Sequence, residues 1–302
     1  MTLTETTTPT PTSTTTPALT LDLLGPSFGA EVVGLDLRTA SDAEVAAIGA
    51  ALVDRKVLFF RGQDLTDDDQ VELARRLGSP TAAHPVVAGL DDAHPEIYNI
   101  DSADPAFSFS DVWHTDVTFM ERPPAGSILR AVQLPPAGGD TSWADSQLAY
   151  ESLAAPVRAL VDQLDAVHDG DREWGMHLRR GRGGEGNVWD DKVVTELPPV
   201  VHPVVRVHPV SGRRGLFVNP GFTSHVVGVS EHESRGILDL LYAHLTKPEH
   251  TIRHRWQTGD VGIWDNRATS HYANRDYTDV RVMRRITLAG DQPVGVRGAA
   301  GA

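Results

Sequence analysis

The chain has 302 residues, 40% of them hydrophobic and 23% charged, with a formal net charge of −14. A chain of this length forms about two globular domains or one large β-rich domain. The acidic charge argues against a protein that binds a phosphate backbone, and no apolar run reaches the length of about 18 residues that predicts a transmembrane helix. Cysteine is absent, which excludes disulfide scaffolds, thiol nucleophiles and cysteine-ligated metals.

The two ends of the chain differ in composition from the part between them. Residues 1–18 are rich in threonine and proline, so we expect a disordered tail. They lack the basic and apolar regions of a signal peptide, and a cytoplasmic location is therefore the default expectation. Residues 19–296 are expected to form a single domain with a glycine- and arginine-rich lid loop at about 169–191, followed by a flexible tail at 297–302.

Helices and strands are predicted throughout the central part. Capping boxes at Ser41 and Ser230 each predict the start of a helix. Further helices are expected at Thr66–Leu77, Ser146–Leu153 and Pro156–Leu164. Strands are expected at Ala30–Leu37, Lys56–Gly62, Glu96–Ile100, Val112–Phe119, Ser127–Leu134, Thr141–Ala144, Val200–Val207, Gly215–Asn219, His225–Val229, Thr251–Trp256, Val261–Trp264 and Val282–Leu288. Many short strands with a few peripheral helices indicate a β-sandwich or a jelly roll.

The sharpest local motif is the stretch VWHTDVTF. On a strand, His114 and Asp116 would project from the same face and offer two ligands to a divalent metal. The stretch GIWDNRATSHYAN offers His271 as a third ligand. Two histidines and one carboxylate form the facial triad of non-haem Fe(II) oxygenases. The His-x-Asp motif alone is a weak signal in an acidic chain with 13 histidines.

Two further residues strengthen this hypothesis. Arg285, in RVMRRITLAGD, and Thr141, in PPAGGDTSW, would supply the guanidinium and hydroxyl that a dicarboxylate cosubstrate needs at its far carboxylate. The chain resembles the taurine dioxygenase and alkylsulfatase branch of the Fe(II)/2-oxoglutarate-dependent dioxygenases in these stretches and in two more, LFVNPGFTSHVVGVSEHES and LTKPEHTIRHRWQTGDVGIWDNRATSHYANRDY. The resemblance extends from about Leu19 to Val296.

The resemblance implies a mainly β fold with flanking helices, a double-stranded β-helix (jelly roll). It places Fe(2+) on His114, Asp116 and His271, and it places 2-oxoglutarate on Thr141, Arg281 and Arg285. The implied reaction uses 2-oxoglutarate and O2 as cosubstrates, hydroxylates a small to medium anionic organic substrate of the sulfonate or alkyl sulfate type, and releases succinate and CO2. Homodimers or homotetramers are usual among such proteins, and neither a nucleic acid nor a membrane is an expected partner.

The match is weaker around the substrate. The residues that the resemblance places there are His84, Val87, Ser110, Glu173, Trp174, Phe222 and Arg285. His84 and Arg285 retain anion-binding groups, whereas Val87 replaces a tyrosine and Ser110 replaces an asparagine that touches taurine. Trp174 adds a larger aromatic surface. We therefore predict a substrate that has an anionic head group and a bulkier, more apolar body than taurine.

Three alternatives remain open at this point. The enzyme could hydroxylate, desaturate or epoxidise an apolar carboxylic acid or a terpenoid of secondary metabolism. A jelly-roll binding protein with a vestigial site is a second alternative, but it would not need the complete set of ligands. A zinc hydrolase is a third, and it would leave the arginine and threonine without a function.

Overall fold

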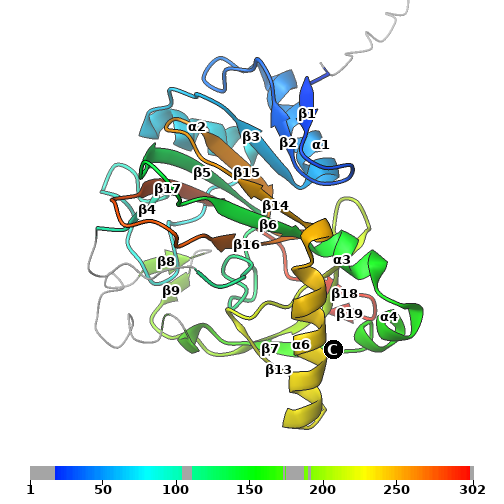
Figure 1. Cartoon of the computed structure of the whole chain (residues 1–302). Helices are drawn as coiled ribbons and strands as arrows, with labels where there is room; N and C mark the ends of the chain where they lie inside the picture. The colour runs from blue at the N-terminus through cyan, green and yellow to red at the C-terminus, as the bar shows by residue number, and fades with distance from the viewer. Residues whose placement is uncertain (1–17, 104–110, 173, 175–186, 190–191, 300–302) are drawn as a thin grey trace, which may run out of the picture.

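The computed structural model describes residues 18–103, 111–172, 174, 187–189 and 192–299. The strands of its main sheet are ordered β1 (Leu21–Leu23), β2 (Ala30–Val32), β3 (Val57–Phe60), β15 (Val261–Asp265), β5 (Gly126–Gln133), β17 (Val282–Leu288) and β4 (Tyr98–Asp101) (Figure 1). Neighbouring strands in this sheet are antiparallel, except β2 and β3, which are parallel.

Smaller sheets complete the β structure. One is ordered β14 (Thr251–His254), β6 (Thr141–Asp145), β16 (Thr269–Ala273), and another is ordered β10 (Val200–Pro203), β7 (Asp165–His168), β13 (Thr223–Val226). A third is ordered β12 (Arg214–Leu216), β11 (Val205–Val207), β18 (Val294–Gly295), β19 (Gly298–Ala299), and β8 (Asn187–Trp189) pairs with β9 (Lys192–Val194). Phe59, Trp143 and Trp264 pack in one cluster between the main sheet and the sheet that contains β6. These two sheets therefore face each other, as in a jelly roll.

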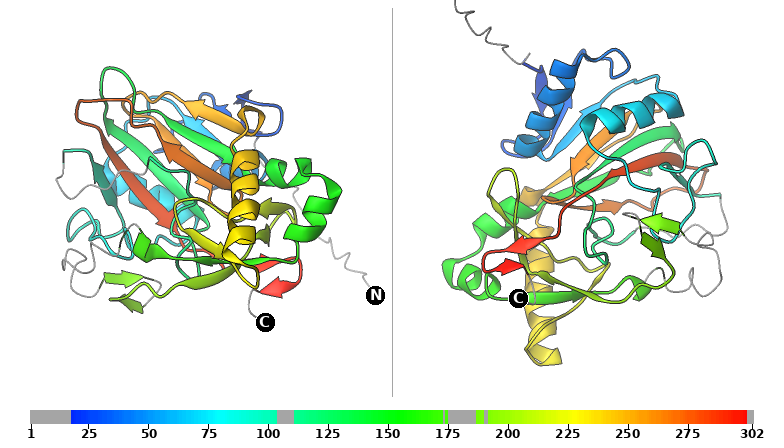
Figure 2. Two further views of the ribbon diagram at one scale, coloured as in Figure 1. Left: turned by 60° about the horizontal axis from the view of Figure 1, so that its bottom comes forward. Right: turned by 180° about the vertical axis from the view of Figure 1, so that it is seen from behind.

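Helices cover the outer face of the main sheet and one side of the smaller ones (Figure 2). Helices α1 (Asp42–Arg55) and α2 (Asp67–Leu77) begin at capping boxes, and α6 (Glu231–Leu245) does so at Ser230. Two short helices, α3 (Ser146–Ser152) and α4 (Ala155–Val161), follow β6, and single 3₁₀ turns lie at η1 (Gly170–Arg172) and η2 (Pro248–His250). Among the described residues, no helix has the length and apolar character needed to cross a membrane.

Alternation of side chains along β5 and β17 separates a packing face from a functional face. Ile128 and Ile286 point outward into the core beneath α1 and α2, whereas Leu129 and Met283 point inward toward β6. This is the period of two expected of a strand. Charged residues on the same strands follow the same rule, and the outward ones anchor a helix.

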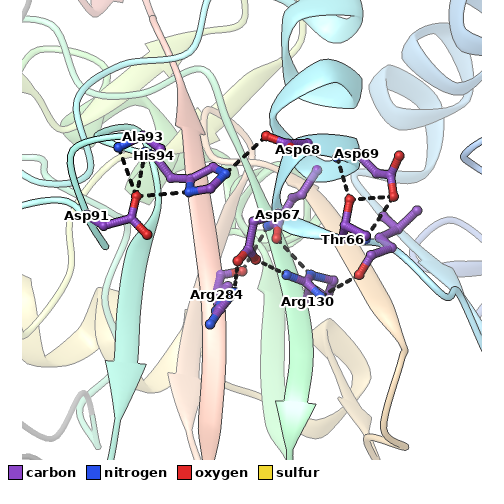
Figure 3. Close-up of polar contacts among 11 residues, drawn as sticks. Thr66, Asp67, Asp68, Asp69, Asp91, Ala93, His94, Arg130 and Arg284 are labelled. Carbon is purple, nitrogen blue, oxygen red and sulfur yellow. Dashed lines mark hydrogen bonds and ion pairs between the residues drawn. The ribbon is translucent and has the colours of Figure 1, made fainter.

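The first turn of α2 is tied to the main sheet by an ion-pair cluster (Figure 3). The Asp67 carboxylate pairs with Arg130 of β5 and with Arg284 of β17, which are cross-strand neighbours. Gln70 accepts a hydrogen bond from Arg130 Nε at 3.0 Å and donates to Arg284 O at 2.9 Å. Asp67 therefore neutralises two adjacent guanidinium groups that would otherwise repel each other at the base of the helix.

The structure corrects several predicted elements. No strand forms at Val112–Phe119: His114 makes an isolated bridge to His271, and the chain then turns at Val117, whose φ is 56°. The expected strand Val200–Val207 divides into β10 and β11, and Ala30–Leu37 shortens to β2. The predicted N-terminal tail lies almost wholly outside the described residues, as does most of the predicted lid loop. Of the predicted C-terminal tail, Gly298–Ala299 form β19, which pairs with β18, and residues 300–302 lie outside the described residues.

Candidate active site

His114, Asp116 and His271 converge on one point. Their ligand atoms all lie within 4.8 Å of one another, and all three residues are buried. His114 Nε2 lies 3.9 Å, and His271 Nε2 3.7 Å, from Asp116 Oδ1. His114 Nδ1 donates to Val112 O at 2.8 Å, which leaves the lone pair of Nε2 directed at the other two ligands. Two imidazole nitrogens and one carboxylate oxygen on one side of an ion are the donor set that fits non-haem Fe(II).

Backbone pairing holds the two histidines together. His114 N donates to His271 O at 2.9 Å, and His271 N donates to His114 O at 2.7 Å. The hydroxyls of Ser270 and Thr115 add cross-links to His114 O and Thr269 O. The predicted alternation along a strand is therefore not what brings Asp116 to the histidines. The chain turns after Asp116 because Val117 adopts a left-handed conformation.

The surroundings of Asp116 keep it ionised. Its Oδ2 accepts a hydrogen bond from Ser127 Oγ at 2.8 Å, and its Oδ1 is paired with Arg285 Nη1 at 2.5 Å. Burial alone would raise the pKa of Asp116, but Arg285 and the two histidines outweigh it and hold the pKa below its usual range. Burial lowers the pKa of His271 to about 3, so its imidazole is neutral at physiological pH. A metal would therefore meet an ionised Asp116 and a neutral His271, the protonation states in which these two side chains bind metals.

The histidine ligands line a cavity that also contains an arginine–threonine pair. Arg281 is 5% exposed, donates from Nε to Gly139 O at 2.9 Å, and places Nη2 3.5 Å from Thr141 Oγ1. In the part of the chain that the structure describes, no carboxylate lies within ion-pair distance of Arg281. A buried guanidinium without a carboxylate partner, facing a cavity, is suited to an anionic ligand.

This geometry changes one predicted pairing. The sequence paired Thr141 with Arg285, whereas the guanidinium that reaches Thr141 in the structure belongs to Arg281. Arg285 lies against Asp116 instead, and its guanidinium carbon is 5.2 Å from the centre of the Tyr98 ring. The two arginines are separated by four residues, which is about 13 Å along an extended strand. Both line the same cavity, where Arg281 contacts Thr141 and Arg285 contacts Asp116.

Most of the predicted substrate residues gather in an apolar cluster beside the metal ligands. Trp174 and Phe222 are buried in it, and Val87 packs against it. The ring centres of His84 and Trp174 are 4.4 Å apart, and those of Phe222 and His114 are 6.1 Å apart, with the latter two rings nearly perpendicular. Ser110 and Glu173 lie outside the described residues.

Several residues of the site were not found from the sequence. The centre of the Tyr98 ring lies 5.6 Å from the centre of the His84 ring and 5.2 Å from the guanidinium carbon of Arg285. Ser127 donates a hydrogen bond to the Asp116 carboxylate. No motif marks Tyr98. Ser127 could have been found from the alternation along its strand, because the predicted strand Ser127–Leu134 places it on the same face as Leu129.

Comparison with known proteins identifies the family. Residues 20–287 match the model of the family described as "Taurine catabolism dioxygenase TauD, TfdA family". The chain belongs to this family. As a TauD, TfdA dioxygenase it is 44% identical to an alpha-ketoglutarate-dependent sulfate ester dioxygenase of Pseudomonas putida, over 93% of each chain. It is 41% identical to an alkylsulfatase of Acinetobacter baylyi, over 94% of this chain and 89% of the relative.

A solved structure confirms the fold. The crystal structure of a taurine dioxygenase from Burkholderia xenovorans matches with a TM-score of 0.77 and 40% identity, covering 93% of this chain and 94% of that one. The predicted jelly-roll fold and the predicted membership of the taurine dioxygenase and alkylsulfatase branch are thus confirmed. The dioxygenase family and the buried His–Asp–His centre agree with each other.

Proposed function

We propose that this TauD, TfdA dioxygenase uses Fe(II), 2-oxoglutarate and O2 to hydroxylate alkyl sulfate esters, releasing succinate and CO2. One observation carries the proposal: the His114, Asp116 and His271 centre shares a cavity with Arg281, a buried arginine that has no carboxylate partner among the described residues. Two relatives named for sulfate ester and alkyl sulfate chemistry support the substrate class. When bound, the iron with its cosubstrates supplies the oxidising power that converts a C–H bond into C–OH.

Arg281 and Thr141 would hold the distal carboxylate of 2-oxoglutarate. The guanidinium can donate two parallel N–H bonds to a carboxylate. Trp256 Nε1 donates to Thr141 Oγ1 at 2.9 Å, which uses an acceptor site of that oxygen and leaves the hydroxyl proton for an incoming carboxylate. The buried position removes water that would compete for these donors.

His84 and Arg285 would bind the anionic head of the substrate. His84 Nδ1 accepts a hydrogen bond from Val86 N at 3.3 Å, so in the neutral ring the proton is on Nε2, which is a donor. Arg285 adds a positive charge on the inner face of β17. A sulfate group matches these donors, and the adjoining side chains of Val86, Phe119 and Phe222 offer an apolar wall to an alkyl body.

The chemistry of the ester explains how hydroxylation becomes cleavage. A hydroxyl added to the carbon that bears the sulfate oxygen gives an unstable adduct. Its C–O bond to sulfate breaks as the new hydroxyl becomes a carbonyl, which yields an aldehyde and hydrogensulfate. One O2 and one 2-oxoglutarate are consumed for each ester, and one succinate and one CO2 are released. A substrate with a carboxylate head would give a stable alcohol instead.

Product analysis tests this proposal. With Fe(II), 2-oxoglutarate and octyl sulfate, we expect equal amounts of succinate and sulfate, and far less succinate with taurine. Asp116→Ala, which removes one metal ligand, should abolish both products. Succinate formation with octanoate but not with octyl sulfate would replace the sulfate ester by the carboxylic acid alternative. Absence of succinate with every substrate would overturn the dioxygenase proposal itself.

The proposal also includes a cytoplasmic location, which is the default expectation from the sequence, and a homodimeric or homotetrameric assembly, which the family resemblance implies. Light scattering of the purified chain measures the assembly directly. A monomeric mass would remove that part without affecting the proposed chemistry.

A further inference from the structure

The side chain of Asn266 makes three hydrogen bonds, and two of them are to the metal ligand Asp116. Asn266 follows the last residue of β15, is fully buried, and lies next in sequence to Asp265. Its Oδ1 accepts from Asp116 N at 2.9 Å, and its Nδ2 donates to Asp116 O at 3.0 Å and to Pro124 O at 3.0 Å. One side chain therefore satisfies both backbone polar groups of Asp116.

Asp116 needs this support because no regular structure holds it. It lies between the isolated bridge at His114 and the turn at Val117, so no strand partner is available to its N–H or C=O. Val117 is β-branched and has a φ of 56°, a conformation that such residues adopt only under constraint. A buried bend of this kind persists when its surroundings specify it, and Asn266 supplies the specific contacts.

The backbone around Asn266 is itself held in place by hydrogen bonds to neighbouring segments. Asn266 N donates to Ala125 O at 3.0 Å, and Asp265 N donates to Lys56 O at 2.8 Å. The Asp265 carboxylate is in turn bound by His208 and Arg267. The amide of Asn266 is therefore fixed to the end of the main sheet, while the turn that carries Asp116 is fixed to Asn266.

We propose that Asn266 is a positioning residue that sets the place of the Asp116 carboxylate in the metal centre. It acts through the backbone of Asp116, and Ser127 completes the arrangement by holding Oδ2 while Oδ1 faces the histidines. The inference rests on the proposed metal centre. Residues that orient metal ligands in this way typically change metal affinity about 10- to 100-fold when removed.

Gln63 offers a matched control. It is buried, its Oε1 accepts from Leu37 N at 2.9 Å, and its Nε2 donates to Leu35 O at 3.1 Å and Arg61 O at 3.0 Å. The numbers of accepted and donated bonds equal those of Asn266, but every partner of Gln63 lies outside the metal centre. Loss of either amide should lower stability similarly, and only loss of Asn266 should weaken metal binding.

The experiment titrates wild type, Asn266→Ala and Gln63→Ala with Co(II) alone, following visible absorption, and unfolds each metal-free protein in urea. We expect Asn266→Ala to bind Co(II) about 10- to 100-fold more weakly, and Gln63→Ala to bind as wild type does. Hydrogen exchange should show lost protection of the Asp116 amide in the Asn266 variant only. Equal Co(II) affinity of the two variants would overturn the proposed role of Asn266.

Two further outcomes are separable. If Asn266→Ala does not fold, Asn266→Ser and Gln63→Ser repeat the comparison with smaller loss of volume, under the same criterion. If wild type itself fails to bind Co(II), the proposed metal centre is wrong and the role of Asn266 is overturned with it. Normal wild-type binding with an unaffected Asn266 variant overturns the positioning role alone.

Discussion

Arg284 and Arg285 are adjacent along β17, yet their guanidinium groups lie on opposite sides of the main sheet. Arg284 pairs with Asp67 at the start of α2, and Arg285 pairs with Asp116 in the metal centre. Alternation along the strand separates the two environments. One arginine therefore anchors a helix, while its neighbour contributes charge to the site.

The first prediction separates these two functions. Arg284→Leu should lower the free energy of unfolding by about 2 kcal/mol, because the half-buried Asp67 loses one of its two arginine partners. It should leave succinate formation with octyl sulfate unchanged. Arg285→Leu should lower kcat/KM for octyl sulfate about 100-fold, the effect of losing a charged hydrogen bond worth roughly 3 kcal/mol. Urea unfolding and steady-state kinetics of both variants provide the measurements, and similar activity losses would contradict the separation.

Elements with strong local signals were predictable from the sequence. The capping boxes at Ser41 and Ser230 were predicted and form in the structure, because each depends on groups three residues apart. The segment 112–119 was predicted wrongly. Its composition is typical of a strand, but a side chain 150 residues away, Asn266, binds Asp116 N within it, and the chain turns at Val117. Local periodicity contains no information about such a contact.

The residues of the candidate site were predictable where only a few types of side chain can perform the chemistry. His114, Asp116 and His271 were found because few side chains bind iron, and they do converge. The arginines were harder to assign. Arg281 and Arg285 have the same chemistry, and only the structure shows which of them lies beside Thr141. Their roles toward ligands stay predictions.

A second prediction concerns 2-oxoglutarate. Arg281→Leu should raise the 2-oxoglutarate concentration that gives half-maximal succinate formation by more than about 10-fold, since it removes the charged partner of the distal carboxylate. Thr141→Val should have a smaller effect in the same direction. The KM for octyl sulfate should change little in either variant. If Arg285→Leu alters the 2-oxoglutarate requirement and Arg281→Leu does not, the pairing originally predicted from the sequence is restored.

The third prediction concerns acid stability and His202. This residue is 2% exposed on β10, donates from Nε2 to Met120 O at 3.0 Å, and burial lowers its pKa to about 4. The unfolded chain, with a histidine pKa of about 6.5, binds the proton more readily between these two values. Stability contributed by neutral His202 is therefore present above pH 6.5 and is lost as the pH falls toward 4.

Replacement by glutamine tests this directly, because its amide can still donate to Met120 O. Between pH 7 and pH 5, wild type should lose about 2 kcal/mol of stability through His202, and His202→Gln should lose correspondingly less. Urea midpoints at the two pH values measure the difference. Burial also lowers the pKa of His168, so some dependence on pH should remain in the variant. Parallel curves for the two proteins would show that His202 does not titrate as described.

The last prediction addresses substrate length. Val87 is partly buried against the apolar cluster that contains Trp174 and Phe222, so Val87→Tyr should fill space that an alkyl chain would otherwise occupy. Excluding two methylenes from an apolar pocket removes roughly 1.6 kcal/mol, which is about 15-fold in kcat/KM. We expect that loss for octyl sulfate and little change for ethyl sulfate. Val210→Tyr, at a valine that is 65% exposed, is the control for an added ring. Equal losses for both esters would contradict the prediction, because they would mean that the added ring disturbs the sulfate head, which the two esters share, and not the alkyl chain, in which they differ.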